Sequence, residues 1–408
     1  MESEQMRAAL HEAIRQNFEW SEDPSQCGLA ALYAIFNTVL NDKEKYQALL
    51  LNESDAQFHI DVLQLLVDSP NDLDDQTHFF KAMTRLSTRC DIYPASFVLN
   101  RALAAHPREP SGIGGFADVY KEQIQGMKGF FAVKILRHFN IDRERLQRVK
   151  ALAKEVTIWG HLDHPHVLPL YGICEVDHGH PTSYGTISPW QENGDIVQYL
   201  RCQPNVNRIC LVADVASGVS YLHKCNIIHG DLKGVNILIT SSGHACLCDF
   251  GSASFTGDDI SSYSGGGNIR WQAPELLRVS DDHRTCPTVY SDMWSFACVC
   301  YEIMTGRIPF YERSRDTVVV ARLSRGERPS KPAKTDDAFT RFGLTSQLWK
   351  SMTTCWRVDP RSRPLARSIL EWGVLRSASD VCTRPALQWV KEPRFPLSVS
   401  KVKEHLRL

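Results

Sequence analysis

One stretch decides the fold of this chain: Ile227-Ile228-His229-Gly230-Asp231-Leu232-Lys233-Gly234-Val235-Asn236-Ile237-Leu238. It places an Asp, a Lys and an Asn in a short loop directly before an apolar strand. Two further motifs follow along the chain, Cys248-Asp249-Phe250-Gly251 and Gln272-Ala273-Pro274-Glu275. Each motif alone could be an ordinary turn, but their occurrence together in this order and spacing is not a coincidence.

A glycine-rich segment lies upstream, Gly112-Ile113-Gly114-Gly115-Phe116-Ala117-Asp118-Val119. Glycines at this spacing let the backbone turn tightly and bring its N–H groups close to phosphate oxygens. Taken alone, the segment is more typical of a plain hairpin. The following apolar run, Phe131-Ala132-Val133-Lys134, ends on a lysine. That lysine is either a solvated strand end or a fixed cation for nucleotide phosphates. We expect the next helix at about residues 143–159, with Glu155 as the carboxylate best placed to pair with Lys134.

In this order, the motifs resemble the signature set of the eukaryotic protein kinases. The resemblance covers residues 108–378, about two-thirds of the 408-residue chain. Within that superfamily the chain is most similar to the tyrosine-kinase-like serine/threonine kinases of the basidiomycete fungal type. The narrower likeness rests on three phrases, G-G-F-A-D-V-Y at 114–120, S-P-W-Q-E-N-G at 188–194 and H-G-D-L-K-G-V-N at 229–236.

The resemblance implies a two-lobed protein kinase domain of the α+β class. Apolar residues at every fourth position, such as Met6, Leu10, Ile14 and Phe18, predict an all-helical N-terminal region in front of it. The small N-lobe, at about residues 108–191, would hold an antiparallel sheet and one main helix, and the large C-lobe, at about 192–378, would be helical. Residues 1–105 form an acidic helical region whose function the sequence leaves open. Residues 379–408 form a basic, Pro-containing tail that we expect to be loosely packed.

The resemblance also implies a site for ATP and Mg²⁺. Asp231 would orient the substrate hydroxyl and accept its proton, while Lys233 steadies the transferring phosphoryl group. Lys134, held by Glu155, would pair with the nucleotide phosphates. Asn236 and Asp249 would offer oxygen ligands to Mg²⁺. The residues expected to bind ATP are Gly112, Ile113, Gly114, Gly115, Phe116, Ala117, Val119, Ala132, Lys134, Ser188, Pro189, Trp190, Gln191, Leu238 and Cys248.

A supporting scaffold follows from the same resemblance. Asp292 would anchor the catalytic loop from a buried helix, and Arg363 would form a buried pair with Glu275. The residues that match the stack between the lobes are Trp159, Leu170, His229 and Phe250. As a separate hypothesis, Cys248 would react with an electrophile placed in the ATP site.

Three positions depart from the family pattern. Ala117 replaces the third loop glycine, which should stiffen the loop. Gly230 replaces the arginine that usually binds a phosphate on the activation segment, so we expect activity without phosphorylation of residues 251–271. Asn268 stands where a threonine is usual, and its amide could still donate to Asp231. The pair Leu232-Lys233 favours Ser/Thr over tyrosine substrates.

The charge distribution is uneven along the chain. The formal net charge is −1, which excludes a strongly basic nucleic-acid binder. Residues 1–105 carry a net −8 and the remaining residues +7. Opposite charges make intramolecular docking of the front region on the kinase domain plausible. A passive structural extension and a regulatory or partner-binding module both remain open for that region.

The sequence also bears on compartment and processing. Thirteen scattered cysteines indicate reduced thiols in an intracellular protein. The charged start lacks the apolar core of a secretory signal, and no apolar run approaches the ~18 residues of a membrane span. We therefore expect a cytoplasmic or nuclear protein. A zinc site is conceivable at the dense histidines, but ordinary structural roles are favoured for His161, His164, His166, His178 and His180.

Two hypotheses from different classes remain. The first is an active protein kinase that transfers the γ-phosphoryl group of ATP to Ser/Thr of protein substrates. The second is a pseudokinase that signals by binding as a scaffold, and a tyrosine or dual-specificity kinase is a lesser alternative. We favour activity because Lys134, Glu155, Asp231, Asn236 and Asp249 are all present, whereas scaffolds generally lose at least one of these residues.

Overall fold

The computed structural model describes residues 29–51, 55–68, 73–99, 109–113, 117–137, 142–176, 183–258, 268–277, 285–376, 382–387 and 389. The chain divides into two compact units. The first comprises residues 1–161, 170–190 and 390–408, and the second comprises residues 162–169 and 191–389. Several predictions fall outside the described residues, namely those for Gly114, Gly115, Phe116, His178 and His180, for the part of the helical region within residues 1–28 and for the part of the activation segment within residues 259–267.

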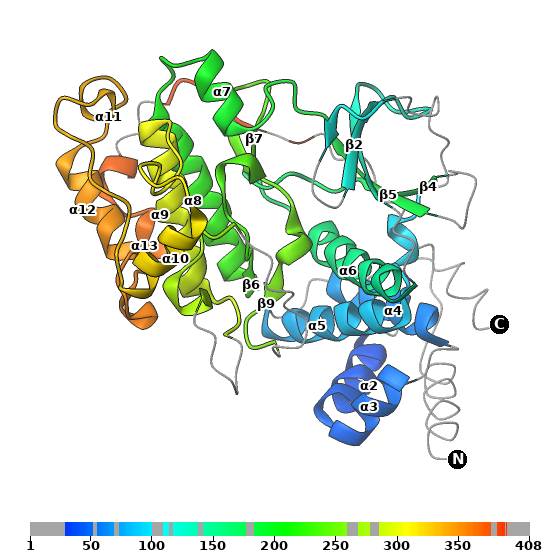
Figure 1. Cartoon of the computed structure of the whole chain (residues 1–408). Coiled ribbons are helices and arrows are strands. Elements are labelled where there is room, and N and C mark those ends of the chain that lie inside the picture. The colour runs from blue at the N-terminus through cyan, green and yellow to red at the C-terminus, as the bar shows by residue number, and fades with distance from the viewer. Residues whose placement is uncertain are drawn as a thin grey trace. The chain divides into compact units, whose positions relative to one another are not determined.

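The first unit contains a five-stranded antiparallel sheet in the order β1-β2-β3-β5-β4 (Figure 1). Strand β3 buries Phe131, Val133 and Ile135 and leaves the alternate residues half-buried, as expected for a strand with one face on a core. The apolar run Phe131–Lys134 therefore lies in a strand. The strands are β1 (Gly112–Ile113), β2 (Ala117–Glu122), β3 (Phe131–Leu136), β4 (Gly172–Val176) and β5 (Ser183–Pro189).

The apolar run from Val167 to Cys174 is a strand only from Gly172 onward. Strand β4 begins at Gly172, while Val167 makes an isolated bridge to Leu247 in the second unit. The residues Val167, Leu168 and Leu170 are buried without belonging to a strand. An apolar run signals burial, and burial alone does not require a regular element.

The front of the chain is helical, as predicted, and is built into the first unit. Helix α4 buries Ile60, Leu63 and Leu66 along one face, and α5 packs along α6. Figure 1 shows α4, α5 and α6 side by side. The helices are α2 (Leu29–Asn41), α3 (Lys43–Leu51), α4 (Ala56–Asp68), α5 (Leu73–Cys90) and α6 (Asp142–Gly160).

A short connector joins these helices to the sheet. After the 3₁₀ turn Ala95–Phe97, Val98 forms a parallel bridge with Ile173, and the Leu99 N–H donates to the Ile173 carbonyl at 2.8 Å. Strand β4 is at the edge of the sheet, so the connector covers backbone groups that would otherwise be unpaired. Leu99 also belongs to the apolar core that contains Val133 and Ile187. The acidic front region therefore contributes to the core of the sheet.

The second unit is mainly helical and is organised around α9, which is buried along nearly its whole length. A Thr288–Ser291 capping box begins α9, and Gly306 with a φ of 68° ends it. Helices α8 and α12 pack against α9. The helices are α7 (Ile196–Cys202), α8 (Arg208–Lys224), α9 (Val289–Thr305), α10 (Asp316–Ser324), α11 (Asp337–Thr340), α12 (Ser346–Cys355) and α13 (Ala366–Ile369).

Two small antiparallel pairs frame the loops of this unit. Strands β7 and β8 pair directly after and directly before the motif residues Asn236 and Cys248, and β6 pairs with β9. The bounds are β6 (Ile227–Ile228), β7 (Ile237–Ile239), β8 (Ala245–Leu247) and β9 (Ser254–Phe255). The sheet-containing and helical units together give the mixed α+β class that the sequence predicted. Within the described residues, no helix has the length and apolarity needed to cross a membrane.

Candidate active site

The lysine of β3 and the glutamate of α6 meet inside the first unit. Lys134 Nζ donates to Glu155 Oε1 at 2.8 Å, the pairing that the sequence predicted. The Glu155 side chain is 6% exposed and that of Lys134 is 25% exposed, so the carboxylate is fixed while the ammonium group keeps access to solvent. A cation held in this way can receive an anionic ligand without losing its partner.

The predicted catalytic loop, at residues 229–236, brings three of the predicted side chains together in the second unit. Asp231 Oδ2 accepts hydrogen bonds from Lys233 Nζ at 2.5 Å and from Asn236 Nδ2 at 3.1 Å. Asn236 Nδ2 also donates to the Asp231 carbonyl at 2.9 Å. Because the amide nitrogen is directed at Asp231, the amide oxygen of Asn236 is left as a possible ligand. An amide oxygen is the kind of atom that Mg²⁺ takes in proteins.

Asp292 on α9 fixes the start of this loop, as predicted. Its carboxylate accepts from the N–H groups of His229 at 2.8 Å and Gly230 at 3.0 Å. It also lies 2.9 Å from His223 Nε2. The Asp292 side chain is 2% exposed, so these donors replace the water that it has lost.

His229 is held in place by contacts from both of its ring nitrogens. The Asp231 N–H donates to His229 Nδ1 at 3.3 Å, so that nitrogen carries the lone pair. His229 Nε2 then donates to the Cys248 carbonyl at 3.2 Å. The His229 ring also lies 5.3 Å from the Phe250 ring, centroid to centroid. A fully buried imidazole thus connects the catalytic loop to the Asp249 motif.

Asp249 lies beside Asn236 in a strained conformation. The Cys248 N–H donates to the Asn236 carbonyl at 3.0 Å, which places one predicted metal ligand, just before β7, next to the other, just after β8. Asp249 has a φ of 65° and a ψ of 76°, in the left-handed region. Such a conformation costs a non-glycine residue on the order of 1–2 kcal/mol and is concentrated at functional sites. The donor set of an amide and a carboxylate oxygen fits Mg²⁺.

The predicted nucleotide-binding residues divide between the two units. In the first unit, Gly112 pairs with Val119 across β1 and β2, and Ala132 pairs with the buried Ser188 across β3 and β5. The Trp190 N–H donates to the Phe130 carbonyl at 3.0 Å, so this residue is anchored to the end of the sheet. Ile113, Ala117 and Pro189 also lie in strands of this sheet, while Gln191, Leu238 and Cys248 belong to the second unit.

The Arg363 pair with Glu275 is also present. Arg363 Nη1 and Nη2 donate to the two carboxylate oxygens of Glu275 at 2.6 and 2.8 Å. The Arg363 side chain is fully buried and donates further to the carbonyls of Arg357 and Tyr290. A two-point pair of this kind holds the end of the Gln272–Glu275 motif in place.

Glu302 is a site residue that sequence reasoning missed. Its carboxylate accepts hydrogen bonds from the Gly234 N–H at 2.9 Å and from Trp271 Nε1 at 2.5 Å. It therefore joins the predicted catalytic loop to Trp271, which directly precedes the Gln272–Glu275 motif. Burial raises the pKa of Glu302 to about 7, while the two donors act in the opposite direction. A carboxylate inside an otherwise apolar helix, at Phe296–Met304, was the only signal in the sequence.

Two of the departures from the family pattern gain a structural account. Gly230 has a φ of +78°, and an added Cβ would lie 2.7 Å from the Ser252 carbonyl oxygen. Glycine suits this position because other residues would meet both strain and a backbone clash. Asn268 is exposed, and in the part of the chain that the structure describes its amide makes no hydrogen bond to Asp231. The expected Asn268 contact is therefore not observed.

Two of the histidines singled out in the sequence, His161 and His164, have ordinary structural partners, as favoured from the sequence. His161 contacts the Thr157 carbonyl at 2.7 Å and Gln64 Oε1 at 2.8 Å. His164 stacks on Tyr221 with a centroid distance of 4.8 Å, and burial lowers the pKa of His164 to about 4. These rings fill packing positions rather than a zinc site.

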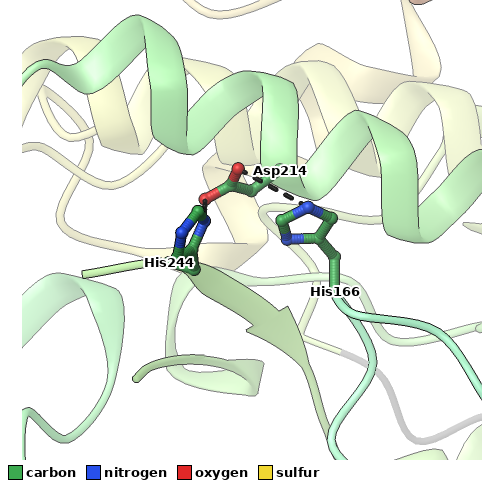
Figure 2. Close-up of side chains that lie close together, drawn as sticks. All are labelled: His166, Asp214 and His244. Atoms are coloured by element: carbon green, nitrogen blue, oxygen red, sulfur yellow. Dashed lines mark ion pairs between the residues drawn. The ribbon is translucent and has the colours of Figure 1, made fainter. Parts of the chain in front are cut away.

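His166 does approach two further metal-ligating groups, Asp214 of α8 and His244 (Figure 2). One ligand atom from each of the three lies within 4.8 Å of the others. The Asp214 carboxylate is already paired with Arg384, however. Arg384 Nη1 and Nη2 donate to the two Asp214 oxygens at 2.8 and 2.9 Å. A metal ion would have to displace that guanidinium group, so this cluster is better described as an anchor for Arg384.

This anchor corrects the expectation of a loosely packed tail. Besides the Arg384 pair, His244 Nε2 donates to the Pro385 carbonyl at 2.8 Å. Trp389 Nε1 donates to the carbonyls of His164 and Pro165 at 3.2 and 3.0 Å. The described residues of the tail are therefore fixed on the second unit, because one buried aspartate needs a cation that is distant in sequence.

Comparisons with known proteins agree with the geometry of these motifs. Mitogen-activated protein kinase kinase kinase 1 of Mus musculus is 28% identical over 280 residues, 65% of this chain and 18% of that protein. Receptor-interacting serine/threonine-protein kinase 4 of Mus musculus is 28% identical over 286 residues, 68% of this chain and 34% of that protein. A probable serine/threonine-protein kinase of Dictyostelium discoideum is 30% identical over 268 residues, 64% of this chain and 49% of that protein.

The chain thus spans between 18% and 49% of the length of these relatives. Tyrosine-protein kinase Btk of Drosophila melanogaster matches to a similar degree, with 28% identity over 70% of this chain and 35% of that protein. The family model for protein tyrosine and serine/threonine kinases matches residues 108–372, which are more than half of the chain. The chain therefore belongs to the protein tyrosine and serine/threonine kinase family.

Proposed function

We propose that this chain is an active, Mg²⁺-dependent kinase that transfers the γ-phosphoryl group of ATP to serine or threonine hydroxyls of proteins. The observation that carries the proposal is the connected set around Asp231, whose carboxylate accepts hydrogen bonds from the side chains of both Lys233 and Asn236. The Lys134–Glu155 pair is also formed. A scaffold that only binds partners has no need to keep all of these contacts.

The residue roles follow from charge and from the loose transition state of phosphoryl transfer, in which catalysis is mainly positioning and electrostatics. Asp231 accepts the hydroxyl proton, with Lys233 as the adjacent cation. Lys134 binds phosphate oxygens. Asn236 and Asp249 are the residues that would hold Mg²⁺, which neutralises charge on the phosphates when bound.

Two observations support serine and threonine as the acceptors. Lysine stands two residues after Asp231, which resembles the serine/threonine pattern. Two of the relatives above carry serine/threonine-protein kinase in their names, while Btk is named a tyrosine-protein kinase. The three phrases quoted from the sequence support placement with the tyrosine-kinase-like kinases of the basidiomycete type. The free cysteines among the described residues are in keeping with an intracellular location, cytoplasmic or nuclear.

The proposed kinase does not depend on phosphorylation of its activation segment. Gly230 has no side chain with which to bind a phosphate on that segment. Removing the hydroxyls of Ser252, Ser254, Thr256, Ser261, Ser262, Tyr263 and Ser264 together is expected to leave phosphotransfer largely intact. A complete loss of activity in that variant would contradict this part of the proposal.

The front helices are proposed to hold α6 in the position that pairs Glu155 with Lys134. Ser87 Oγ of α5 and Thr157 Oγ1 of α6 lie 2.9 Å apart, and both residues are fully buried. Near the end of α6, His161 contacts Gln64 of α4. The Ser87–Thr157 contact joins neutral hydroxyl groups, so at this point the proposed docking of the front region relies on packing and a hydrogen bond rather than on its net charge.

The decisive experiment compares the wild-type chain with Asp231→Asn on peptides whose acceptors are either Ser/Thr or Tyr. We expect Mg-ATP-dependent transfer to the Ser/Thr peptides and a loss of about 10²–10⁴-fold in the variant, because the proton acceptor is removed. Asn is nearly isosteric with Asp, so ATP-dependent thermal stabilisation should persist. Equal, background-level transfer by both proteins would support the pseudokinase alternative, and transfer to Tyr peptides alone would overturn the substrate assignment.

A further inference from the structure

The tail meets α8 at two points one helical turn apart. Asp214 and Cys210 are four residues apart on α8 and therefore lie on the same face of the helix. Arg384 binds Asp214, and Cys382, two residues earlier in the tail, lies next to Cys210 as its hydrogen-bond partner. The pairing of two tail residues with two helix residues fixes the register of the contact.

Arg384 acts on both points of this contact. While Nη1 and Nη2 bind Asp214, its Nε donates to Cys382 Sγ at 3.0 Å. Nη1 also donates to the Gly243 carbonyl at 2.8 Å, so the guanidinium plane is fixed. A guanidinium directed at a sulfur atom stabilises the thiolate form, which is the reactive form of cysteine.

The two cysteines differ in exposure and in acidity. Cys382 is half-buried and reachable from solvent, whereas Cys210 is 5% exposed. Burial disfavours the Cys382 thiolate, but the bonds from Arg384 and Cys210 outweigh it and lower the pKa of Cys382. Burial raises the pKa of Cys210 to about 11. The Cys382 sulfur is thus expected to react first, while Cys210 remains protonated beside it.

We propose that Cys382 and Cys210 form a peroxide-sensitive pair that can lock the tail onto α8 as a disulfide. In the first step the Cys382 thiolate attacks one oxygen of hydrogen peroxide, the O–O bond breaks, and sulfenic acid and hydroxide form. In the second step Cys210 loses its proton and attacks the Cys382 sulfur, releasing the sulfenic oxygen as water. Peroxide is the oxidant and is reduced to water, and a dithiol reductant reverses the bond.

Helix α8 connects the proposed Cys210–Cys382 disulfide to the strand that precedes Asp249. Asp214 Oδ2, which binds Arg384, also accepts from the Ala245 N–H at 2.9 Å. Ala245 begins β8, the strand that leads to Cys248 and Asp249. Fixing the tail therefore fixes a partner of the strand that precedes the predicted Mg²⁺ ligand Asp249, although the disulfide itself does not depend on the proposed kinase activity.

The experiment treats the reduced full-length chain with hydrogen peroxide, removes the peroxide, alkylates the remaining thiols and maps the peptides without reduction. We expect a peptide pair joined through Cys210 and Cys382, with the mass of two hydrogens lost and recovered by a dithiol reductant. Cys225→Ser is the matched control, because Cys225 follows the end of α8 and burial raises its pKa. That control should give the same linked pair.

Two variants separate the steps. Cys210→Ser should give no linked pair but a sulfenic acid at Cys382 that dimedone traps, whereas Cys382→Ser should leave Cys210 unoxidised. Arg384→Lys should slow dimedone labelling of Cys382 several-fold at neutral pH, since lysine lacks the second directed donor. The proposal is overturned if other cysteines oxidise while Cys210 and Cys382 stay reduced. It is equally overturned if urea-unfolded chain forms the same linked pair as fast as folded chain.

Discussion

At the scale of single residues, two left-handed positions flank the catalytic loop. Gly230 and Asp249 have φ values of 78° and 65°, and they lie next to Asp231 and Phe250. Glycine accepts this conformation freely, but aspartate does not, so the strain at Asp249 is maintained by its surroundings. The motif phrases in the sequence named both residues, yet only the backbone angles show why one is a glycine.

The role of Gly230 can be measured against a matched glycine. We expect Gly230→Ala to lower the free energy of unfolding by about 2 kcal/mol or more, about 1 from the backbone conformation and the rest from the Ser252 carbonyl. Gly257→Ala is the control, because Gly257 has a φ of +83° with no atom within 4 Å of an added Cβ. Urea unfolding of both variants gives the difference. Equal losses would show that the Ser252 contact is unimportant.

Glu302 predicts a pH dependence of stability. Its pKa is raised by burial to about 7 from an ordinary 4.5. Between these values the folded state holds a proton that the unfolded state has released, so the free energy of unfolding falls as pH rises through this window. The fall amounts to about 3 kcal/mol in total and ends above the folded pKa.

The measurement is urea unfolding of the wild-type chain and Glu302→Gln at several values from pH 4.5 to pH 8. Glutamine keeps an oxygen for Gly234 and Trp271 but does not titrate. The wild-type stability should therefore decline relative to the variant as pH rises to about 7. Parallel profiles would mean that Glu302 is already charged in the folded protein.

At the scale of elements, helix α6 is held by contacts with β3 and by contacts with α4 and α5. Its side toward β3 supplies Glu155 to Lys134, and its contacts with α4 and α5 involve Thr157 and His161. Gly160 lies against Phe97 so closely that an added Cβ would be 2.4 Å from the ring. Helix position and active-site pairing are thus set by the same short stretch of α6.

A double-mutant cycle tests this arrangement. Ser87→Ala and Thr157→Val should each cost about 1 kcal/mol of stability, and the cycle should show a coupling of about 0.5–1.5 kcal/mol because they share one bond. If α6 is held through this bond, each single variant should also raise the KM for ATP. Thr88→Ala is a suitable control, since the Thr88 hydroxyl donates to the Thr84 carbonyl of its own helix. An unchanged KM together with lost stability would indicate a purely structural role.

At the scale of the whole molecule, the division by charge does not match the division by packing. The acidic front belongs to the same compact unit as the sheet, and part of the basic tail is fixed on the helical unit. The near-zero net charge thus conceals parts of opposite sign, but the Ser87–Thr157 contact between α5 and α6 joins neutral groups. A boundary at residue 105 stays a prediction from composition.

Removal of the tail should destabilise the protein, because it removes the Asp214–Arg384 pair. Truncation after residue 378 leaves Asp214, whose side chain is 6% exposed, without its guanidinium partner, so we expect a loss of about 3–5 kcal/mol in the free energy of unfolding. Asp214→Asn in the truncated chain should recover part of that loss, because the unpaired charge is gone. Truncation without effect on urea unfolding would show that the tail contact is dispensable.

The sequence by itself determined the motifs and most elements, because phosphate-binding loops, catalytic loops and amphipathic helices are written in residues close together along the chain. It predicted Lys134 with Glu155, Asp292 with the loop and Arg363 with Glu275 through resemblance. Only the tertiary structure decided that Glu302 joins two motifs, that Leu99 enters the core of the sheet and that Asp214 binds Arg384. Each of these depends on a buried group contacting a partner far away in sequence. Local sequence patterns do not indicate which distant residue that partner is.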